Sequence, residues 1–310
     1  MARTSLTPLV THPAPWTGND LARAPAQWLY ELSAEEIGEL DEAINRVVRD
    51  DVPFTAIDRT SFPLPTLAAR VAAWVDQVRD GFGFVVIRGL PVMRWSLDET
   101  RRGFLGLGRH IGELIRQNAA GDLVADVRAE RGAGDPSARR YETSDETPFH
   151  TDGSDMIALL CLRQGRSGGQ SSIVSSVAVI NQVAHERPDL VSLLFEPWPF
   201  AMTADATDHF ELPLVSTVSP FSLFYIRWYI EQSQSQANTP RLSARHTELL
   251  DLIDAAACEH HLEIEFRPGD LQLLSNRTVM HARTTFEDWD EPARRRHLLR
   301  LWLQHHDSIA

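Results

Sequence analysis

Three side chains from two distant stretches of the chain have the types and spacing of metal ligands. His150 and Asp152 flank Thr151, and His281 stands far downstream. In an extended segment alternate side chains project to the same face, so one ion can contact both His150 and Asp152. Two imidazoles and one carboxylate leave the opposite face of a divalent iron open to a chelating co-substrate and dioxygen. These residues predict a redox metal centre.

The surroundings of His281 strengthen this prediction. A His-x-Asp triplet by itself is common, and most histidines in proteins have structural hydrogen bonds instead. His281, however, ends the stretch PGDLQLLSNRTVMH, a strand-turn unit that can return the chain to the mouth of a β-barrel. The other histidines are isolated, or paired at a strand start or in the tail, which favours solvated or structural roles.

Two arginines near the C-terminus indicate an anion-binding wall. Arg296 and Arg300 are four residues apart in a predicted strand, so both point to one face. The consecutive arginines 294–296 would be typical of a solvated surface. The apolar strand that follows nevertheless favours burial, and a buried arginine is very costly without an anionic partner.

The ligand types alone leave two other functions open. A zinc hydrolase can use the same three residues and a water molecule. A non-catalytic jelly-roll binding protein with a vestigial site is the second alternative. The two arginines favour the redox enzyme, because they offer a site for an anionic co-substrate that a hydrolase does not need.

The composition is that of a globular protein with a full core, and it excludes several functions. With 43% hydrophobic content and a formal net charge of −13 over 310 residues, an extended nucleic-acid-binding surface is not expected. No stretch approaches the roughly 20 apolar residues of a membrane span, and no signal peptide is recognisable. Cys161 and Cys258 are too few for a disulfide framework. We expect a cytoplasmic protein with a small-molecule substrate and no membrane partner, for which homo-oligomer formation is open.

Local signals predict mainly helices in the first part of the chain. Residues 1–30 are rich in Pro, Thr and Ala and predict an irregular arm. Ser33 and Ser96 each begin a capping box ahead of apolar residues at helical spacing. A further helix is expected over 67–78, and the apolar run 82–88 predicts a buried strand.

Strand signals dominate the rest of the chain. A polar loop over 132–148 leads into His150, and the apolar runs 156–162 and 172–179 predict a β-hairpin around a glycine-rich turn. A helical insertion is expected over about 181–258, before strand signals return. The pattern predicts a mainly β fold with helical additions (α+β), an antiparallel double-sheet barrel within one domain over 31–310.

These stretches together resemble the iron(II)- and 2-oxoglutarate-dependent dioxygenases of the taurine dioxygenase-like superfamily, related to clavaminate synthase and γ-butyrobetaine hydroxylase. The resemblance runs from about Gly81 to Gln304. It rests on FHTDGSD, SGGQSS, PGDLQLLSNRTVMHAR and RRRHLLRLWL, which occur in this order.

The resemblance implies a double-stranded β-helix (jelly-roll) core with N-terminal helices and a helical insertion. It implies that His150, Asp152 and His281 bind Fe(II), with 2-oxoglutarate as co-substrate and dioxygen as oxidant. Arg296 is then expected to bind the distal carboxylate of 2-oxoglutarate, a group that its planar fork matches. Ser171 is expected to contact the same carboxylate, at a position where many relatives have threonine.

The resemblance also implies a class of reaction. We expect a non-haem iron dioxygenase that hydroxylates, desaturates or cyclises at an unactivated C–H bond of a small carboxylate- or amino-acid-like metabolite. Asp152 favours these outcomes over halogenation, because halogenating relatives have a small residue in its place. Arg300 is expected to hold an anionic group of the substrate, and Arg227 and Gln117 are further candidates for the substrate pocket.

Overall fold

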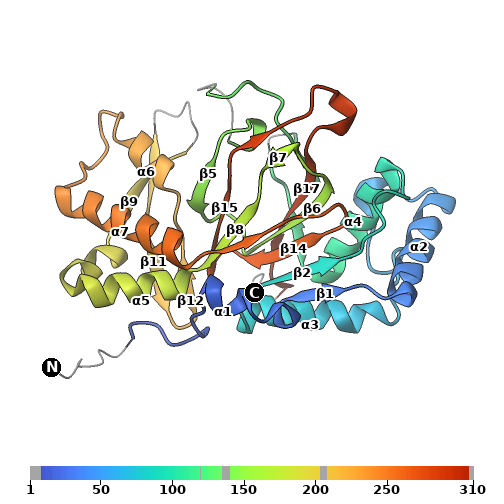
Figure 1. The fold of residues 1–310 in the computed structure, drawn as a ribbon, viewed down its shortest axis with the longest axis horizontal. Helices are drawn as coiled ribbons and strands as arrows, with labels where there is room; N and C mark the ends of the chain where they lie inside the picture. Colours follow the sequence, from blue (N-terminus) through green and yellow to red (C-terminus); the bar gives the residue numbers. More distant parts are fainter. Residues whose placement is uncertain (1–7, 119, 135–139, 203–207, 307–310) are drawn as a thin grey trace.

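Two β-sheets lie at the centre of the molecule, and helices cover the outer side of each (Figure 1). The computed structural model describes residues 8–118, 120–134, 140–202 and 208–306. This arrangement agrees with the double-sheet barrel expected from the sequence.

The larger sheet has seven strands. They are β1 (Leu29–Glu31), β2 (Phe84–Arg88), β3 (Glu113–Ile115), β4 (Ala125–Val127), β6 (Met156–Arg163), β14 (Leu271–Ser275) and β17 (His297–Gln304). Their order is β1-β2-β14-β6-β17-β3, and β4 also pairs with β17. The pair β1 and β2 is parallel, and the other pairs are antiparallel.

The smaller sheet carries two of the predicted metal ligands. Its strands are β5 (Thr147–His150), β8 (Ser171–Ser175), β13 (Leu262–Ile264) and β15 (Val279–Arg283). They pair in the order β13-β8-β15-β5, all antiparallel. In the pair of β15 and β5, His281 lies directly opposite His150. The register of this sheet therefore brings the two imidazoles together.

An apolar cluster joins the two sheets. It contains Phe84, Ile157 and Leu298 from the larger sheet and Ile173 and Val279 from the smaller one. The inner faces of both sheets thus line a closed interior. A polar side chain on these faces must find a partner there, because it is shielded from water.

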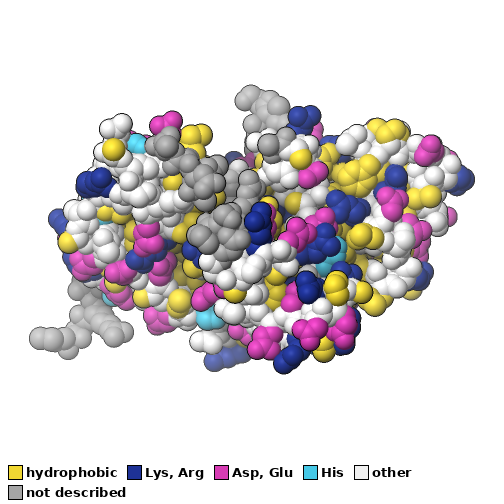
Figure 2. Space-filling view, turned by 90° about the horizontal axis from the view of Figure 1, so that it is seen from above, with side chains coloured by type: hydrophobic (Ala, Val, Ile, Leu, Met, Phe, Trp, Pro, Cys, Tyr) yellow, Lys and Arg dark blue, Asp and Glu magenta, His cyan; other side chains and the backbone are white. Residues whose placement is uncertain are grey.

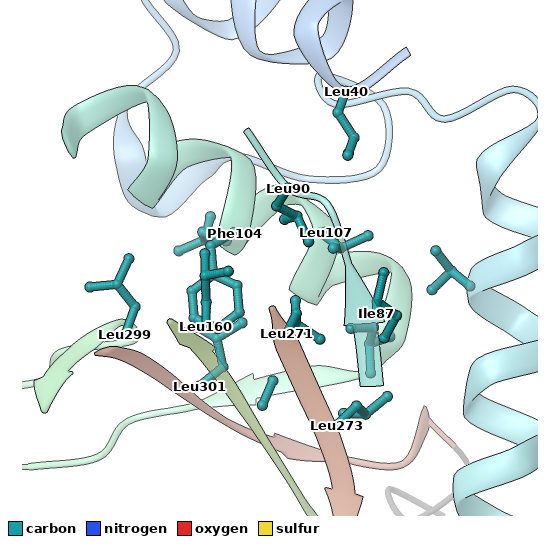
Figure 3. Close-up of a cluster of buried hydrophobic side chains, with 14 of the residues drawn as sticks. Leu40, Ile87, Leu90, Phe104, Leu107, Leu160, Leu271, Leu273, Leu299 and Leu301 are labelled. Atoms are coloured by element: carbon teal, nitrogen blue, oxygen red, sulfur yellow. The ribbon is translucent and has the colours of Figure 1, made fainter. Parts of the chain in front are cut away.

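Three helices cover the outer face of the larger sheet. They are α2 (Ala34–Arg49), α3 (Leu67–Asp80) and α4 (Leu97–Ile111), and the capping boxes predicted at Ser33 and Ser96 are both confirmed. Phe104 and Leu107 of α4 belong to one apolar cluster with Leu160, Leu299 and Leu301 of the sheet, and Figure 3 shows Phe104 beside Leu160. Because Leu299 and Leu301 of β17 face the helices, Leu298 and Arg300 face the barrel interior.

Helices and short strands cover the smaller sheet on the other side of the molecule. They are α5 (Ser176–Glu186), the 3-10 helix η4 (Pro188–Phe195), β9 (Pro197–Ala201), β10 (His209–Pro213), β11 (Val215–Val218), β12 (Phe221–Leu223), α6 (Arg227–Ser233) and α7 (Ala244–His260). A second apolar cluster packs them against the sheet. The insertion expected to be helical therefore also contains two antiparallel strand pairs.

The hairpin predicted over 156–179 is wrong. β6 and β8 belong to different sheets, so the glycine-rich turn between them carries the chain across the barrel. The second apolar run also ends early as a strand, because the Ser175 side chain accepts a hydrogen bond from the Ala178 amide and begins α5.

The remaining elements are short. They are α1 (Gly18–Ala22), η1 (Pro25–Gln27), η2 (Phe54–Ala56), η3 (Arg140–Glu142), η5 (Pro292–Arg294), β7 (Ser167–Gly168) and β16 (Phe286–Glu287). The described part of the predicted irregular arm therefore contains α1 and η1, and its end joins the larger sheet as β1. Residues 1–7 of the arm lie outside the described residues.

The outer surface of the described residues is mixed in charge. On the face that Figure 2 shows, acidic and basic side chains alternate with apolar ones and form no large basic area. None of the helices in the described ranges combines the length and apolar character that crossing a bilayer requires.

Candidate metal centre

His150, Asp152 and His281 meet at one point inside the barrel. Their potential ligand atoms all lie within 4.8 Å of one another. The ring centroids of the two histidines are 4.2 Å apart, and His150 Nε2 lies 3.8 Å from Asp152 Oδ1. His281 Nδ1 is buried and finds no hydrogen-bond partner among the described residues. Two imidazoles, one carboxylate and an unsatisfied ring nitrogen fit a divalent metal ion such as iron(II).

Thr151 fixes the direction of its two neighbours. Its amide donates to Tyr225 O at 2.9 Å, and its hydroxyl oxygen accepts from the Tyr225 amide at 3.0 Å. Thr151 is fully buried, and its amide and hydroxyl are both occupied by these bonds. The side chains of His150 and Asp152 are thereby left to point together, as the alternation of an extended segment predicted.

Both histidines are held in the neutral form that binds metal. His150 Nδ1 lies 2.8 Å from Pro148 O, and because a carbonyl can only accept, Nδ1 carries the proton and Nε2 offers its lone pair. Burial lowers the pKa of His150, and burial together with the neighbouring His150 lowers the pKa of His281 to about 3.

Asp152 is kept ionised and oriented by groups from β17 and from the turn after β14. Burial opposes its charge, but Arg300, the two histidines and Trp302 together outweigh burial and lower the pKa of the Asp152 carboxyl. Trp302 Nε1 donates to Oδ2 at 2.9 Å, and Asn276 Oδ1 accepts from the Asp152 amide at 3.0 Å. Asn276 and Trp302 were not among the predicted site residues. The alternation that placed Arg300 on the inner face could have indicated Trp302, two residues further on.

Arg300 lies beside Asp152 and is held by Gln117. Its Nη1 is 3.9 Å from Asp152 Oδ2, and its Nε donates to Gln117 Oε1 at 2.8 Å. Gln117 Nε2 donates to Arg300 O at 2.9 Å and to Leu123 O at 2.8 Å. The guanidinium also lies near the rings of Tyr141 and Trp302, at 5.0 and 4.8 Å from their centroids. Gln117 therefore positions Arg300, and its own polar atoms are occupied.

Arg296 is a buried cation with an unused donor. Its side chain is 4% exposed, and its Nη1 has no hydrogen-bond partner in the described part of the chain. Nη2 donates only a long bond of 3.4 Å to Gly169 O. Burial lowers the pKa of Arg296 to about 10, and the nearby Asp288 and Cys161 offset this effect only in part.

The glycine-rich turn closes around Arg296. Gly169 has a φ of +73°, and a Cβ there would lie 2.9 Å from Arg296 Nε. Only glycine adopts this conformation easily and leaves room for the guanidinium. Arg296 also lines a cavity of about 300 Å³ together with Cys161, Phe266 and Leu298.

Ser171, which follows this turn, is buried at the start of β8. Its hydroxyl donates to Gln272 Oε1 at 3.0 Å, across the barrel from one sheet to the other. Ser171 and Arg296 therefore both lie beside the glycine-rich turn.

Arg227 has a different environment from the one expected for a substrate-binding residue. Its guanidinium pairs with Asp254 and Asp251 at 2.8 Å each and with Glu231 at 2.7 Å. These three carboxylates occupy its donors and fix α6 against α7. Its neighbour Trp228 lies closer to the metal centre, in an edge-to-face contact with His150 in which the two ring centroids are 4.9 Å apart.

Comparison with known proteins identifies relatives over nearly the whole chain. FR-33289 synthase of Streptomyces rubellomurinus is 28% identical over 290 residues, which cover 90% of this chain and 85% of that protein. The taurine hydroxylase-like protein SAT17 of Stachybotrys chartarum is 27% identical and is covered over 75% of its length.

Solved structures show the same fold. Asparagine oxygenase, in complex with Fe(II), (2S,3S)-3-hydroxyasparagine and succinate, superposes with a TM-score of 0.73 at 18% identity, over 89% of this chain and 93% of that one. The non-heme iron oxygenase OrfP, with Fe and alpha-ketoglutaric acid, gives a TM-score of 0.66 at 16% identity, over 89% and 93% of the two chains. These likenesses confirm the predicted fold.

The family model described as "Taurine catabolism dioxygenase TauD, TfdA family" matches residues 50–302. This range contains the three residues of the metal cluster. It also contains the two buried arginines, Arg296 just before β17 and Arg300 within it. The family resemblance predicted from the sequence is thereby confirmed. The chain belongs to the taurine catabolism dioxygenase TauD, TfdA family and is an iron(II)- and 2-oxoglutarate-dependent oxygenase.

Proposed function

We propose that this enzyme oxidises an unactivated C–H bond of a small carboxylate- or amino-acid-like metabolite and converts 2-oxoglutarate to succinate in the same cycle. The observation that carries the proposal is the His150, Asp152 and His281 cluster, together with the buried Arg296, whose Nη1 has no hydrogen-bond partner among the described residues. These three residues would hold the iron. When bound, the iron supplies the activation of dioxygen, a chemistry that no side chain provides.

Arg296 and the Ser171 segment would bind the distal carboxylate of 2-oxoglutarate. The unused Nη1 of Arg296 supports this role, because a buried guanidinium is stable only with an anionic partner. The small Gly169 lets the guanidinium approach the turn. The far end of the co-substrate is then held while its keto acid end faces the metal cluster.

Arg300 would bind an anionic group of the substrate. Gln117 fixes its Nε, so the terminal nitrogens can face a ligand beside Asp152. Asparagine oxygenase was solved with a hydroxylated asparagine and OrfP with (3S)-hydroxy-L-Arg, so amino acids occupy both structural neighbours. Hydroxylation of an amino-acid-like substrate is therefore the favoured outcome, and desaturation or cyclisation at the same carbon is the alternative. Arg227 is not included, since its donors are occupied.

The segment that carries η3 would exclude water from the reaction. Tyr141 contacts the Arg300 guanidinium, and Arg140 lies over the Trp228 ring at 4.8 Å. Arg283 of β15 donates to the carbonyl oxygens of Thr143 and Asp145 and so fastens this segment to the barrel. A closed, dry site favours oxidation of the bound substrate over side reactions.

One spectroscopic experiment tests the proposal against its alternatives. Anaerobic addition of Fe(II) and 2-oxoglutarate to the metal-free protein should produce a weak visible charge-transfer band, and a mixture of candidate amino acids should then stimulate succinate release in air. Asp152→Ala should lose both signals. A zinc hydrolase or a binding protein with the same fold would give no band, and normal turnover by Asp152→Ala would contradict the assigned ligand. Cytoplasmic location and homo-oligomer formation stay predictions.

A further inference from the structure

Gln272 is a fully buried amide on the inner face of the larger sheet. It lies in β14 between Leu271 and Leu273, which pack against the outer helices, while Gln272 faces the barrel. Its side chain is 0% exposed, and its Nε2 finds no hydrogen-bond partner among the described residues. Buried polar groups in proteins are almost always paired, so this donor lacks an acceptor that the chain itself does not provide.

The other end of the amide is fixed by Ser171. The serine hydroxyl donates to Gln272 Oε1 at 3.0 Å, so Oε1 points to Ser171 and Nε2 is turned away from it. A hydroxyl has only one proton to donate. In this arrangement Ser171 has no proton left for a ligand, and it presents only lone pairs, which a carboxylate would avoid.

The unpaired amide and the unpaired guanidinium share one end of the barrel. Arg296 Nη2 contacts Gly169 O, two residues before Ser171, and Ser171 contacts Gln272. An amide nitrogen lies only about 2.3 Å from the oxygen of the same group, so Gln272 Nε2 is also within a few ångströms of Ser171. Arg296 Nη1 and Gln272 Nε2 are therefore two buried donors without acceptors near the same turn.

We propose that Gln272 donates a hydrogen bond to the distal carboxylate of 2-oxoglutarate beside Arg296, and that Ser171 is a positioning residue that orients the glutamine amide. This assignment rests on the proposed function, since it deepens the binding of the same co-substrate. A carboxylate accepts several hydrogen bonds, so a guanidinium and an amide together satisfy it better than either does alone. The pair of Ser171 and Gln272 then supplies the donor that the serine hydroxyl cannot supply by itself.

Two co-substrates of equal chain length test the contact directly. 2-Oxoglutarate and 2-oxopentanoate have the same keto acid end, but 2-oxopentanoate has a methyl group in place of the distal carboxylate. Affinity of each acid is measured anaerobically on the Fe(II)-loaded protein by the charge-transfer band, and on the Mn(II)-loaded protein by calorimetry. Gln272→Met should weaken 2-oxoglutarate binding by about tenfold to a hundredfold, the effect of one hydrogen bond to a charged group. Binding of 2-oxopentanoate should change by less than about twofold.

A second variant guards against a folding defect. Gln272→Glu keeps the size of the side chain and the acceptor for Ser171 but replaces the donor nitrogen with an oxygen. It should therefore weaken the binding of 2-oxoglutarate at least as much as Gln272→Met does. Gln182→Met, in α5 with its amide bonded to Glu186, is the matched control and should bind both acids like the wild type. If the Gln272 variants unfold more easily but keep the wild-type preference for 2-oxoglutarate, the glutamine is only structural and the assignment is overturned.

The role of Ser171 is tested by combining the substitutions. If the serine acts only through the glutamine, Ser171→Ala should weaken 2-oxoglutarate binding in the wild type but cause no further loss in Gln272→Met. An equal loss in both backgrounds would show that Ser171 contacts the carboxylate itself and would overturn its positioning role. Failure of the wild type to bind 2-oxoglutarate at all would instead refute the proposed function, so the two failures are distinguishable.

Discussion

Arg300 is held by one glutamine side chain, which makes the proposed substrate clamp testable apart from the co-substrate site. Gln117→Leu removes the acceptor of Arg300 Nε and leaves the guanidinium free to turn away. We expect the KM for the substrate to rise about tenfold while the KM for 2-oxoglutarate stays unchanged, because one oriented hydrogen bond is lost. Substrate-stimulated succinate release, measured while each concentration is varied, checks this.

The neighbouring residue provides the control for this prediction. Asn118→Ala alters the same loop, but the Asn118 amide bonds to Asp122 rather than to Arg300. It should leave both KM values at their wild-type level. An equal rise of both KM values in Gln117→Leu would mean that the glutamine supports the whole site rather than Arg300.

At the scale of single residues, the metal ligands could be predicted, but the contacts that Asn276 and Trp302 make with Asp152 could not. The alternation of an extended segment is a local rule, so it placed His150 and Asp152 on one face without knowledge of the fold. Asn276, in the turn after β14, and Trp302, in β17, reach Asp152 from segments that are distant in the sequence. The carboxylates that occupy Arg227 include two from α7, and no local pattern shows such a contact.

Asp126 connects three elements, and its protonation has a calculable effect on stability. Its carboxylate accepts from His297 Nε2 at 2.6 Å and from Arg101 Nη1 of α4 at 3.0 Å. Burial alone would raise the pKa of this carboxyl, but the bond from His297 and the charge of Arg101 lower it to about 2. The unfolded chain binds this proton near pH 4. The stabilisation is therefore complete above about pH 4 and is lost as the pH falls toward 2.

Asp126→Asn should reveal this contribution. At pH 7 we expect the free energy of unfolding to fall by roughly 1 to 2 kcal/mol, allowing for the partial exposure of the side chain. Urea unfolding at pH 7 and at pH 3 should show that the difference in the free energy of unfolding between wild type and variant is smaller at the lower pH. Asp76→Asn breaks an exposed ion pair with Arg79 in α3, and its free energy of unfolding should differ little from that of the wild type at either pH. A pH-independent deficit of Asp126→Asn would contradict the electrostatic origin.

At the scale of elements, helix starts were predictable and strand pairing was not. The capping boxes at Ser33 and Ser96 consist of contacts between residues three apart, so the sequence shows them directly. The hairpin expected over 156–179 assumed that consecutive strands are neighbours. In a double-sheet barrel consecutive strands can enter opposite sheets, and the pairing is decided by partners such as β14 and β15, more than a hundred residues away.

Across the whole molecule, the two sheets connect three apolar clusters. In β17, Leu299 packs against the N-terminal helices, while Leu298 packs in the barrel interior. In β8, Ile173 belongs to the interior and Val174 to the cluster under α5 and α7. Each sheet packs one of its faces in the interior cluster and the other face in an outer cluster. No cluster can therefore lose its packing without disturbing the next. The single domain over residues 31–310 stays a prediction, and this packing predicts one cooperative unfolding transition.

Ligand binding should therefore move that transition as a whole. Mn(II), which does not turn over, and 2-oxoglutarate bind only the folded barrel, so each of them, at a hundredfold excess over its Kd, should add about 2.7 kcal/mol to the free energy of unfolding. Differential scanning calorimetry of wild type should show one peak that shifts upward without splitting. His281→Ala removes a ligand from β15 and should abolish the shift, although the buried site is otherwise kept. Two peaks, of which only one responds to the ligands, would mean that the helical layers unfold apart from the barrel and that the sheets do not couple the clusters.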